Sequence, residues 1–274
     1  MPMIERILFP VDFSPSCAAM APYVKRAAGM FGAHVSLVHV CDLASHNGFE
    51  LLVRCLQEIA KEHCAVAEER LKSFLESEFP PAACVRILRS GEAAAEIAGV
   101  ARTGGFDLIV MPTHAGRFRR MLLGSTTAKV LNDADCPVLT TEHAETALPR
   151  PLEHRVWVCA IGLSLDSERV LHLAGRAAAE AGAQLSVIHT TSVEAAVNAR
   201  RRLDELLQKV GCDAAVQITT GPVKEALLDT ALRCAADALI LGRRPCTGAI
   251  GRLRDLTYST YSLIRDSPFP VLSV

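Results

Sequence analysis

The feature that most constrains the fold is an internal repeat, because segments of the first half of the chain recur in the second half in the same order. The clearest pair aligns RAAGMFGAHVSLVH with RAAAEAGAQLSVIH at a shift of 150 residues. The matched pairs are 26–39 with 176–189, 91–111 with 221–241, and 132–140 with 265–273. A repeat of this length in a chain of 274 residues predicts two similar domains.

Short apolar runs alternate with helical patterns in both halves, and this alternation is typical of a parallel sheet covered on both faces. We therefore predict an α/β fold with two tandem doubly wound domains, each a five-stranded, mainly parallel sheet with helices on both faces. The polar stretch 141–153 divides the chain, and we place the domains at 1–143 and 152–274. The expected strands are 6–11, 35–40, 85–88, 108–111 and 138–140, then 156–161, 185–190, 216–219, 239–241 and 271–274, and the expected long helices are 50–78 and 193–210.

Charge and hydropathy exclude several classes of protein. The 29 Lys and Arg residues balance 30 Asp and Glu residues, so the chain lacks the basic excess that a nucleic-acid-binding protein would show. The longest obvious apolar run, Val156–Leu163, is far shorter than the roughly 20 residues that cross a bilayer. The start of the chain lacks a secretion signal and its cysteines form no CxxC pair, so we expect a cytoplasmic protein without nucleic-acid or membrane partners.

Three segments carry a family resemblance: ILFPVDFSPSC, the long stretch FDLIVMPTHAG…FRRMLLGSTTAKVLNDADCPVLT, and the ending SPFPVLSV. Together they resemble the universal stress protein family, in two tandem copies. The resemblance implies binding of ATP or another adenine nucleotide in the first domain, with Mg as an open option. It also implies pairing of two domains through their last strands. A tandem chain can form that pair as an intramolecular pseudo-dimer, and a homodimer of whole chains stays open as well.

The nucleotide pattern of the family is a Gly, two residues, a second Gly, nine residues, and a Gly followed by Ser or Thr. Here the window starts Pro112-Thr113-His114-Ala115 and reaches Gly124-Ser125 after eight residues, and Gly116 partly restores the turn. By the same resemblance, Asp12 takes the place of the residue that contacts adenine, and Val40 the strand-end position that faces the base. In the second half Gly162 replaces that Asp, and Asp255 replaces the third Gly. That half is not expected to bind ATP in the manner of the family.

The residues themselves also point to a phosphate site. Met111 ends an apolar strand, and open parallel sheets bind ligands beyond such ends. The hydroxyl residues after Gly124 are typical helix N-caps, and a helix N-terminus attracts phosphate. The alternatives are a plain loop and cap at Gly124, and an Asp12 that caps its own turn. The candidate binding residues are Pro10, Val11, Asp12, Val40, Met111, Thr113, His114, Gly116, Gly124, Ser125, Thr126 and Thr127.

The remaining sequence motifs indicate no catalytic or metal-binding function. No residue is predicted to be catalytic or to ligate a metal, and no Walker A lysine motif occurs. His39 and His189 recur in both halves, so we assign them to the shared scaffold. The sequence favours a stress-response protein that binds a nucleotide without rapid turnover. The alternatives are a nucleotide-independent interaction module that binds a protein partner, and an enzyme that hydrolyses ATP slowly.

Overall fold

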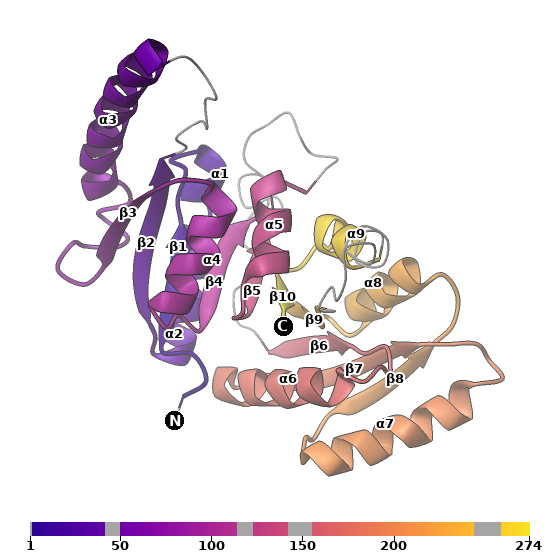
Figure 1. Ribbon diagram of the computed structural model, residues 1–274. Coiled ribbons are helices and arrows are strands. Elements are labelled where there is room, and N and C mark those ends of the chain that lie inside the picture. Colours follow the sequence, from indigo (N-terminus) through magenta and orange to yellow (C-terminus); the bar gives the residue numbers. More distant parts are fainter. Residues whose placement is uncertain (1, 42–49, 114–122, 142–154, 244–258) are drawn as a thin grey trace.

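The described strands form a single ten-stranded sheet in the order β3-β2-β1-β4-β5-β10-β9-β6-β7-β8 (Figure 1). This computed structural model describes residues 2–41, 50–113, 123–141, 155–243 and 259–274. The strands are β1 (Arg6–Pro10), β2 (His34–Cys41), β3 (Val85–Ser90), β4 (Leu108–Pro112), β5 (Val138–Thr141), β6 (Val156–Ala160), β7 (Gln184–Thr190), β8 (Ala215–Thr219), β9 (Ala238–Leu241) and β10 (Val271–Ser273). The predicted α/β fold is confirmed.

Helices cover both faces of the sheet. One face carries α1 (Pro15–Ala18), α2 (Ala21–Phe31), α3 (Glu50–Ser73), α6 (Ser167–Ala181) and α7 (Ala196–Val210), and the other carries α4 (Ala93–Thr103), α5 (Ser125–Asp133), α8 (Val223–Arg233) and α9 (Ser259–Asp266). Side chains alternate between the two faces along each strand. In β1, Ile7 and Phe9 belong to the core of the first face and Leu8 to the core of the second, and all three are fully buried. Two-sided burial explains why these strands are continuous apolar runs.

The two halves of the chain join through their last strands. β5 and β10 pair antiparallel, with Leu139 opposite Leu272, while every other strand pair in the described sheet is parallel. Each strand thereby covers an edge that would otherwise expose unpaired backbone groups. The predicted pairing of the last strands inside one chain is therefore confirmed. We call residues 2–141 the N-terminal half and residues 155–274 the C-terminal half.

Side chains lock this junction on both faces of the sheet. On the first face, the ring of Phe31 in α2 meets the edge of Trp157 in β6, with ring centroids 6.5 Å apart. On the second face, the Tyr261 hydroxyl donates to the backbone oxygen of Ala128 in α5. Arg243, just after β9, donates to three further backbone oxygens at the end of α5 and just beyond it. The halves are therefore joined by more than one strand pair.

The predicted helix over 50–78 is too long at its C-terminal end, because α3 ends at Ser73. Leu75 has a φ of 53°, in the left-handed region that stops an α-helix, and the Phe79 N–H bonds to its carbonyl. No glycine marks this stop in the sequence. The apolar pattern continues because Phe74 and Phe79 both belong to the core, one partly and one fully buried.

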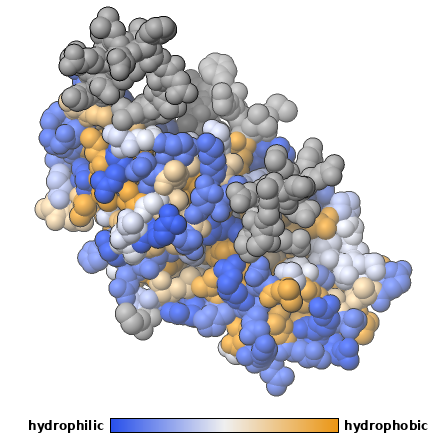
Figure 2. Space-filling view, in the orientation of Figure 1, coloured by the Kyte–Doolittle hydropathy of each residue, from blue (hydrophilic) through white to orange (hydrophobic). Residues whose placement is uncertain are grey.

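The surface is mixed in character. Hydrophilic residues cover much of the face drawn in Figure 2, and hydrophobic residues show between them in separate areas. Exposed apolar side chains such as Val66 and Val197 are distributed over different helices. None of the helices within the described ranges is both long enough and apolar enough to cross a membrane.

Candidate functional site

A cavity of about 230 Å³ opens at the carboxyl ends of β1, β2 and β4 in the N-terminal half. β1 pairs with β2 on one side and with β4 on the other, so this is the point where the strand order reverses. Open α/β sheets bind ligands at such a point. We call it the first cavity, and its lining residues are Pro10, Val11, Asp12, Cys17, Val38, His39, Val40, Ala93, Ile97, Met111, Pro112, Gly124, Ser125, Thr126 and Thr127.

The turn after β1 holds Asp12 at the wall of the first cavity. Its Oδ1 accepts a hydrogen bond from the Ser14 N–H at 2.9 Å, so the carboxylate caps its own turn. The Ser14 hydroxyl in turn caps α1 by accepting from the Cys17 N–H at 3.1 Å. Asp12 itself is exposed, and its Oδ2 has no partner among the described residues. One carboxylate oxygen therefore caps the turn, as one of the two predicted alternatives had it, and the second oxygen is free to accept a hydrogen bond from a ligand.

Aromatic side chains support this turn from behind. Phe13 has a φ of 62°, which strains a residue other than glycine. Its ring lies against the His39 ring at a centroid distance of 4.3 Å and under the Arg70 guanidinium at 4.7 Å. The His39 Nδ1–H donates to the Val11 carbonyl at 2.7 Å. His39 therefore ties the end of β2 to the end of β1, as its assignment to the scaffold predicted.

The N-terminus of α5 faces the first cavity from the other side. Gly124 is the N-cap and no side chain caps it, so the predicted role of the hydroxyl residues as caps is wrong. Ser125, Thr126 and Thr127 instead form the first turn, where the N–H groups have no acceptor within the helix. The Thr127 hydroxyl donates to the Pro112 carbonyl at 3.0 Å. This bond holds the helix end against β4 and leaves the partial positive charge of the helix at the cavity.

An ion pair links the two helices whose first residues, Ala93 and Ser125, line the first cavity. The Lys129 ammonium lies 2.8 Å from the carboxylate of Glu92, and both side chains are more than half exposed. Glu92 is also the N-cap of α4 and accepts from the Ala95 N–H. The hydrogen bond from Lys129 lowers the pKa of Glu92. The pair links α4 to α5, and sequence reasoning missed it because the two residues lie 37 positions apart.

Nine of the twelve predicted binding residues line the first cavity together. Thr113 does not, because it is buried and its backbone N–H bonds to the Thr141 carbonyl at 3.3 Å. His114 and Gly116 lie outside the described residues. The lining residues that the prediction lacked are Cys17, Val38, His39, Ala93, Ile97 and Pro112. Most of them are apolar residues whose spacing along the strands and helices is equally typical of the hydrophobic core, so the sequence did not distinguish them as cavity residues.

The Cys17 thiol is a neutral part of the cavity wall. It is buried, lies 3.7 Å from the Pro10 carbonyl oxygen and donates to it. Burial raises the pKa of this thiol to about 12. The thiol therefore stays protonated at neutral pH and is not a nucleophile. Within the described residues, no group of three or more His, Cys, Asp or Glu side chains is placed to hold a metal ion.

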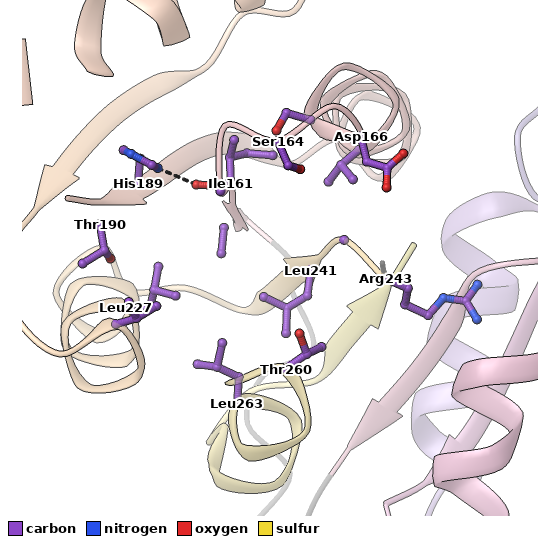
Figure 3. A pocket seen from close by; sticks show the side chains of 16 residues that line it. Ile161, Ser164, Asp166, His189, Thr190, Leu227, Leu241, Arg243, Thr260 and Leu263 are labelled. Carbon is purple, nitrogen blue, oxygen red and sulfur yellow. Dashed lines mark hydrogen bonds between the residues drawn. The ribbon is translucent and has the colours of Figure 1, made fainter. Parts of the chain in front are cut away.

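A second cavity, of about 350 Å³, lies at the corresponding strand ends of the C-terminal half (Figure 3). His189 again bonds to the end of the neighbouring strand, with its Nδ1–H 2.7 Å from the Ile161 carbonyl. Gly162 stands where Asp12 stands in the first cavity, so this wall lacks the carboxylate. The Arg243 guanidinium points away from the cavity toward the N-terminal half. The second cavity is therefore larger than the first and has different polar groups.

Fold and site together define a duplicated α/β protein with a cavity at each strand-order reversal. The model of the family described as "Universal stress protein family" matches residues 3–141, which is just over half of the chain. The chain belongs to the universal stress protein family. Among curated relatives, universal stress protein MJ0577 of Methanocaldococcus jannaschii is 27% identical over 155 residues, covering 51% of this chain and 96% of the relative. Universal stress protein MJ0531 of the same organism is 30% identical over 143 residues, covering 51% and 83%.

Solved structures extend the likeness of fold to both halves. The crystal structure of a universal stress protein from Archaeoglobus fulgidus has a TM-score of 0.72 at 23% identity, and the match covers 98% of this chain and 97% of that one. A functionally unknown protein from Pseudomonas aeruginosa, PA1789, has a TM-score of 0.64 at 19% identity, with 99% and 92% covered. At these identities the likeness shows the fold alone.

Proposed function

We propose that the first cavity binds ATP or another adenine nucleotide, and that the protein acts in a cytoplasmic stress response through this bound state, without rapid turnover. The observation that carries the proposal is the uncapped N-terminus of α5 at the cavity mouth. A helix end of this kind binds phosphate through its backbone N–H groups. The exposed carboxylate of Asp12 lies on another wall of the same cavity, where it can accept from the amino group of a base.

The size of the first cavity determines how the ligand would lie. About 230 Å³ is below the 300–1,000 Å³ that is common for small-molecule sites, so the cavity encloses only part of a nucleotide. The buried side chains of Val38, Ile97 and Met111 supply an apolar wall for the base. The phosphates would then lie at the open mouth beside Ser125 and Thr126. Any Mg ion would arrive with the phosphates and take its other ligands from them and from water.

Isothermal titration of the full chain with ATP tests the proposal. Asp12→Ala removes an acceptor for the base and should weaken binding about tenfold or more, as expected for a hydrogen bond to a charged group. Gly124→Asp places a carboxylate beside the phosphates and should abolish binding, and its backbone φ of −59° accepts the change. Gly29→Asp is the matched control, because this exposed glycine in α2 has open space around it. An absence of binding heat with the parent protein would refute the proposal.

One observation favours a second candidate, a nucleotide-independent module that binds a protein partner. Pro112 lines the first cavity at the position where the family pattern has its first glycine, and its carbonyl already accepts from Thr127. A protein that purifies with adenine nucleotide bound would exclude this candidate. A rate of phosphate release from Mg-ATP above that of a buffer blank would instead support slow hydrolysis. Sedimentation analysis would show whether whole chains also form a homodimer.

A further inference from the structure

Two cysteine thiols lie together between the sheet and α3 in the N-terminal half. Cys41 is the last residue of β2, and Cys64 lies in α3, which packs against β2 and β3 (Figure 1). Both are free cysteines, and their thiols interact with each other. Neighbouring thiols can exchange their two protons and two electrons for a disulfide bond, which an isolated thiol cannot do.

Ser90 shows on which face of the sheet the two thiols meet. Ser90 ends β3 and is the partner of Cys41 in the β2–β3 register. Its hydroxyl oxygen lies 3.7 Å from the Cys64 sulfur, so Cys64 sits over this strand pair. Leu37 belongs to the core on the face that α3 covers, and Cys41, an even number of positions later in the strand, points to the same face. Strand register and side-chain contact therefore agree in placing Cys41 beneath Cys64.

The two thiols differ in accessibility. Cys64 is half-buried, whereas Cys41 is only 8% exposed. Burial, and next the interaction with Cys64, raise the pKa of Cys41 to about 12, so this thiol is protonated at neutral pH. Part of the shift comes from the charge of a Cys64 thiolate, and this part disappears once Cys64 is oxidised. An oxidant therefore meets Cys64 first, and Cys41 is placed to react second.

We propose that Cys41 and Cys64 are a redox-active pair that a hydroperoxide converts into an intramolecular disulfide between β2 and α3. A hydroperoxide is a small two-electron oxidant, so it can reach a half-buried thiol without a docking surface. Disulfides that form in a reducing compartment are typically transient and redox-sensing. Both cysteines lie outside the described lining of the first cavity, so this proposal does not depend on the binding of a nucleotide.

The reaction balances with hydrogen peroxide as the only added reactant. The Cys64 thiolate attacks one oxygen, an S–O bond forms as the O–O bond breaks, and the other oxygen leaves as water with the proton that Cys64 gave up. Cys64 is then a sulfenic acid. The Cys41 sulfur attacks the Cys64 sulfur, so the S–S bond forms, the S–O bond breaks, and the hydroxyl leaves as water with the proton of Cys41. Two thiols are oxidised to one disulfide, and one peroxide is reduced to two waters.

Peptide mapping of the full chain tests the proposal. The reduced protein is treated with hydrogen peroxide, its remaining thiols are blocked with N-ethylmaleimide, and it is digested with trypsin for mass spectrometry. Trypsin cleaves after Arg54 and Lys61, so the two cysteines fall in different peptides. We expect a cross-linked peptide that joins Cys41 to Cys64 and that disappears when dithiothreitol is added.

Three variants test the order of the steps. Cys41→Ala removes the second thiol, so sulfenic acid persists at Cys64 and its adduct with dimedone should increase at least about fivefold over the parent protein. Cys64→Ser removes the sulfur that reacts first, so Cys41 should stay a free thiol after peroxide treatment. Cys234→Ala replaces another half-buried cysteine and should leave the cross-link unchanged. Thermal melts establish that each variant is folded, and Cys64→Ser, at the less buried position, keeps the test available if Cys41→Ala unfolds.

The proposal is overturned by any of three results. The first is that peroxide produces no cross-link between Cys41 and Cys64 in the folded parent protein. The second is that dimedone labels Cys64 no more in Cys41→Ala than in the parent. The third is that Cys41 is oxidised as fast in Cys64→Ser as in Cys234→Ala, which would show that Cys64 is not the first thiol to react.

Discussion

Replacing Arg243 with Ala should destabilise the joined protein, because this side chain connects the two halves. Its guanidinium donates to two backbone oxygens at the C-terminal end of α5, 2.9 Å to Leu131 and 3.0 Å to Ala134, and to a third just beyond it, 2.7 Å to Cys136. Carbonyl oxygens at that end of a helix lack partners within the helix and carry partial negative charge, so a cation there is stabilising. Burial lowers the pKa of Arg243, which indicates that part of the gain is offset by desolvation.

The magnitude follows from the bonds that are lost. A net contribution of about 1 kcal/mol for each of the three hydrogen bonds predicts a loss of roughly 3 kcal/mol in the free energy of unfolding. For a chain of this size, this loss corresponds to a melting temperature lower by about 6–12 °C. Urea unfolding can be followed by the fluorescence of Trp157, the single tryptophan, which packs against Phe31 across the junction. The probe therefore reports on the contact between the halves.

Arg102→Ala is the matched control for this experiment. Arg102 forms an ion pair of 3.6 Å with Asp135, and both side chains are largely exposed. Exposed pairs contribute little, so its removal should cost less than about 0.5 kcal/mol. If Arg243→Ala is no more destabilising than Arg102→Ala, the three bonds do not hold the halves together and the reasoning is wrong.

Three further predictions concern the junction, an acid-sensitive pair and a thiol. Deletion of Phe269–Val274 removes β10 and exposes the edge of β5, so the truncated chain should aggregate in light scattering, and a soluble monomer would contradict this. Hydrogen bonds from Arg265 and Lys224 lower the pKa of Asp266 to about 2. The ionised Asp266 carboxylate therefore stabilises the fold above pH 4, and this contribution is lost as the pH falls toward 2. Asp266→Asn should therefore cost roughly 1 kcal/mol at pH 7 and flatten the urea stability curve between pH 4 and 2, whereas an unchanged curve would refute the pairing. Burial keeps the Cys17 thiol protonated, so mass spectrometry should find it unmodified by iodoacetamide at pH 8 in the native protein, and rapid alkylation would contradict this.

The fold was predictable because each of its signals is local or repeated. Continuous apolar runs identify the strands, and the recurrence of 26–39 at 176–189 shows that two copies exist. Pairing of the last strands followed from the family resemblance together with the need to cover an edge. The end of α3 was not predictable, because Leu75 adopts a left-handed conformation that the apolar sequence around it does not signal. Packing of the neighbouring phenylalanines into the core outweighs local preference there.

The site was predictable where chain order alone places residues at strand ends. Asp12 and Met111 line the first cavity for this reason, and Gly124 lines it as the N-cap of the helix that follows β4. Contacts made by side chains were not predictable, since they depend on distances that no sequence spacing encodes. The ion pair between Glu92 and Lys129 is one example. A second is the set of hydrogen bonds from Arg243 to Leu131, Ala134 and Cys136, which lie more than 100 positions away.

Arg243 also explains why the two cavities differ. It corresponds to Thr113 at the shift of 130 residues. The Thr113 N–H bonds to the carbonyl of Thr141, at the end of β5, and the Arg243 N–H bonds in the same way to the carbonyl of Val274, just after β10. At this shared position the N-terminal half has a short side chain, and the C-terminal half has a long cation that reaches α5 across the junction. A cation committed to the junction cannot also neutralise a phosphate in the second cavity. The junction of a duplicated chain is therefore asymmetric in a way that a symmetric pair of identical domains cannot be, and this asymmetry leaves the two cavities with different polar groups.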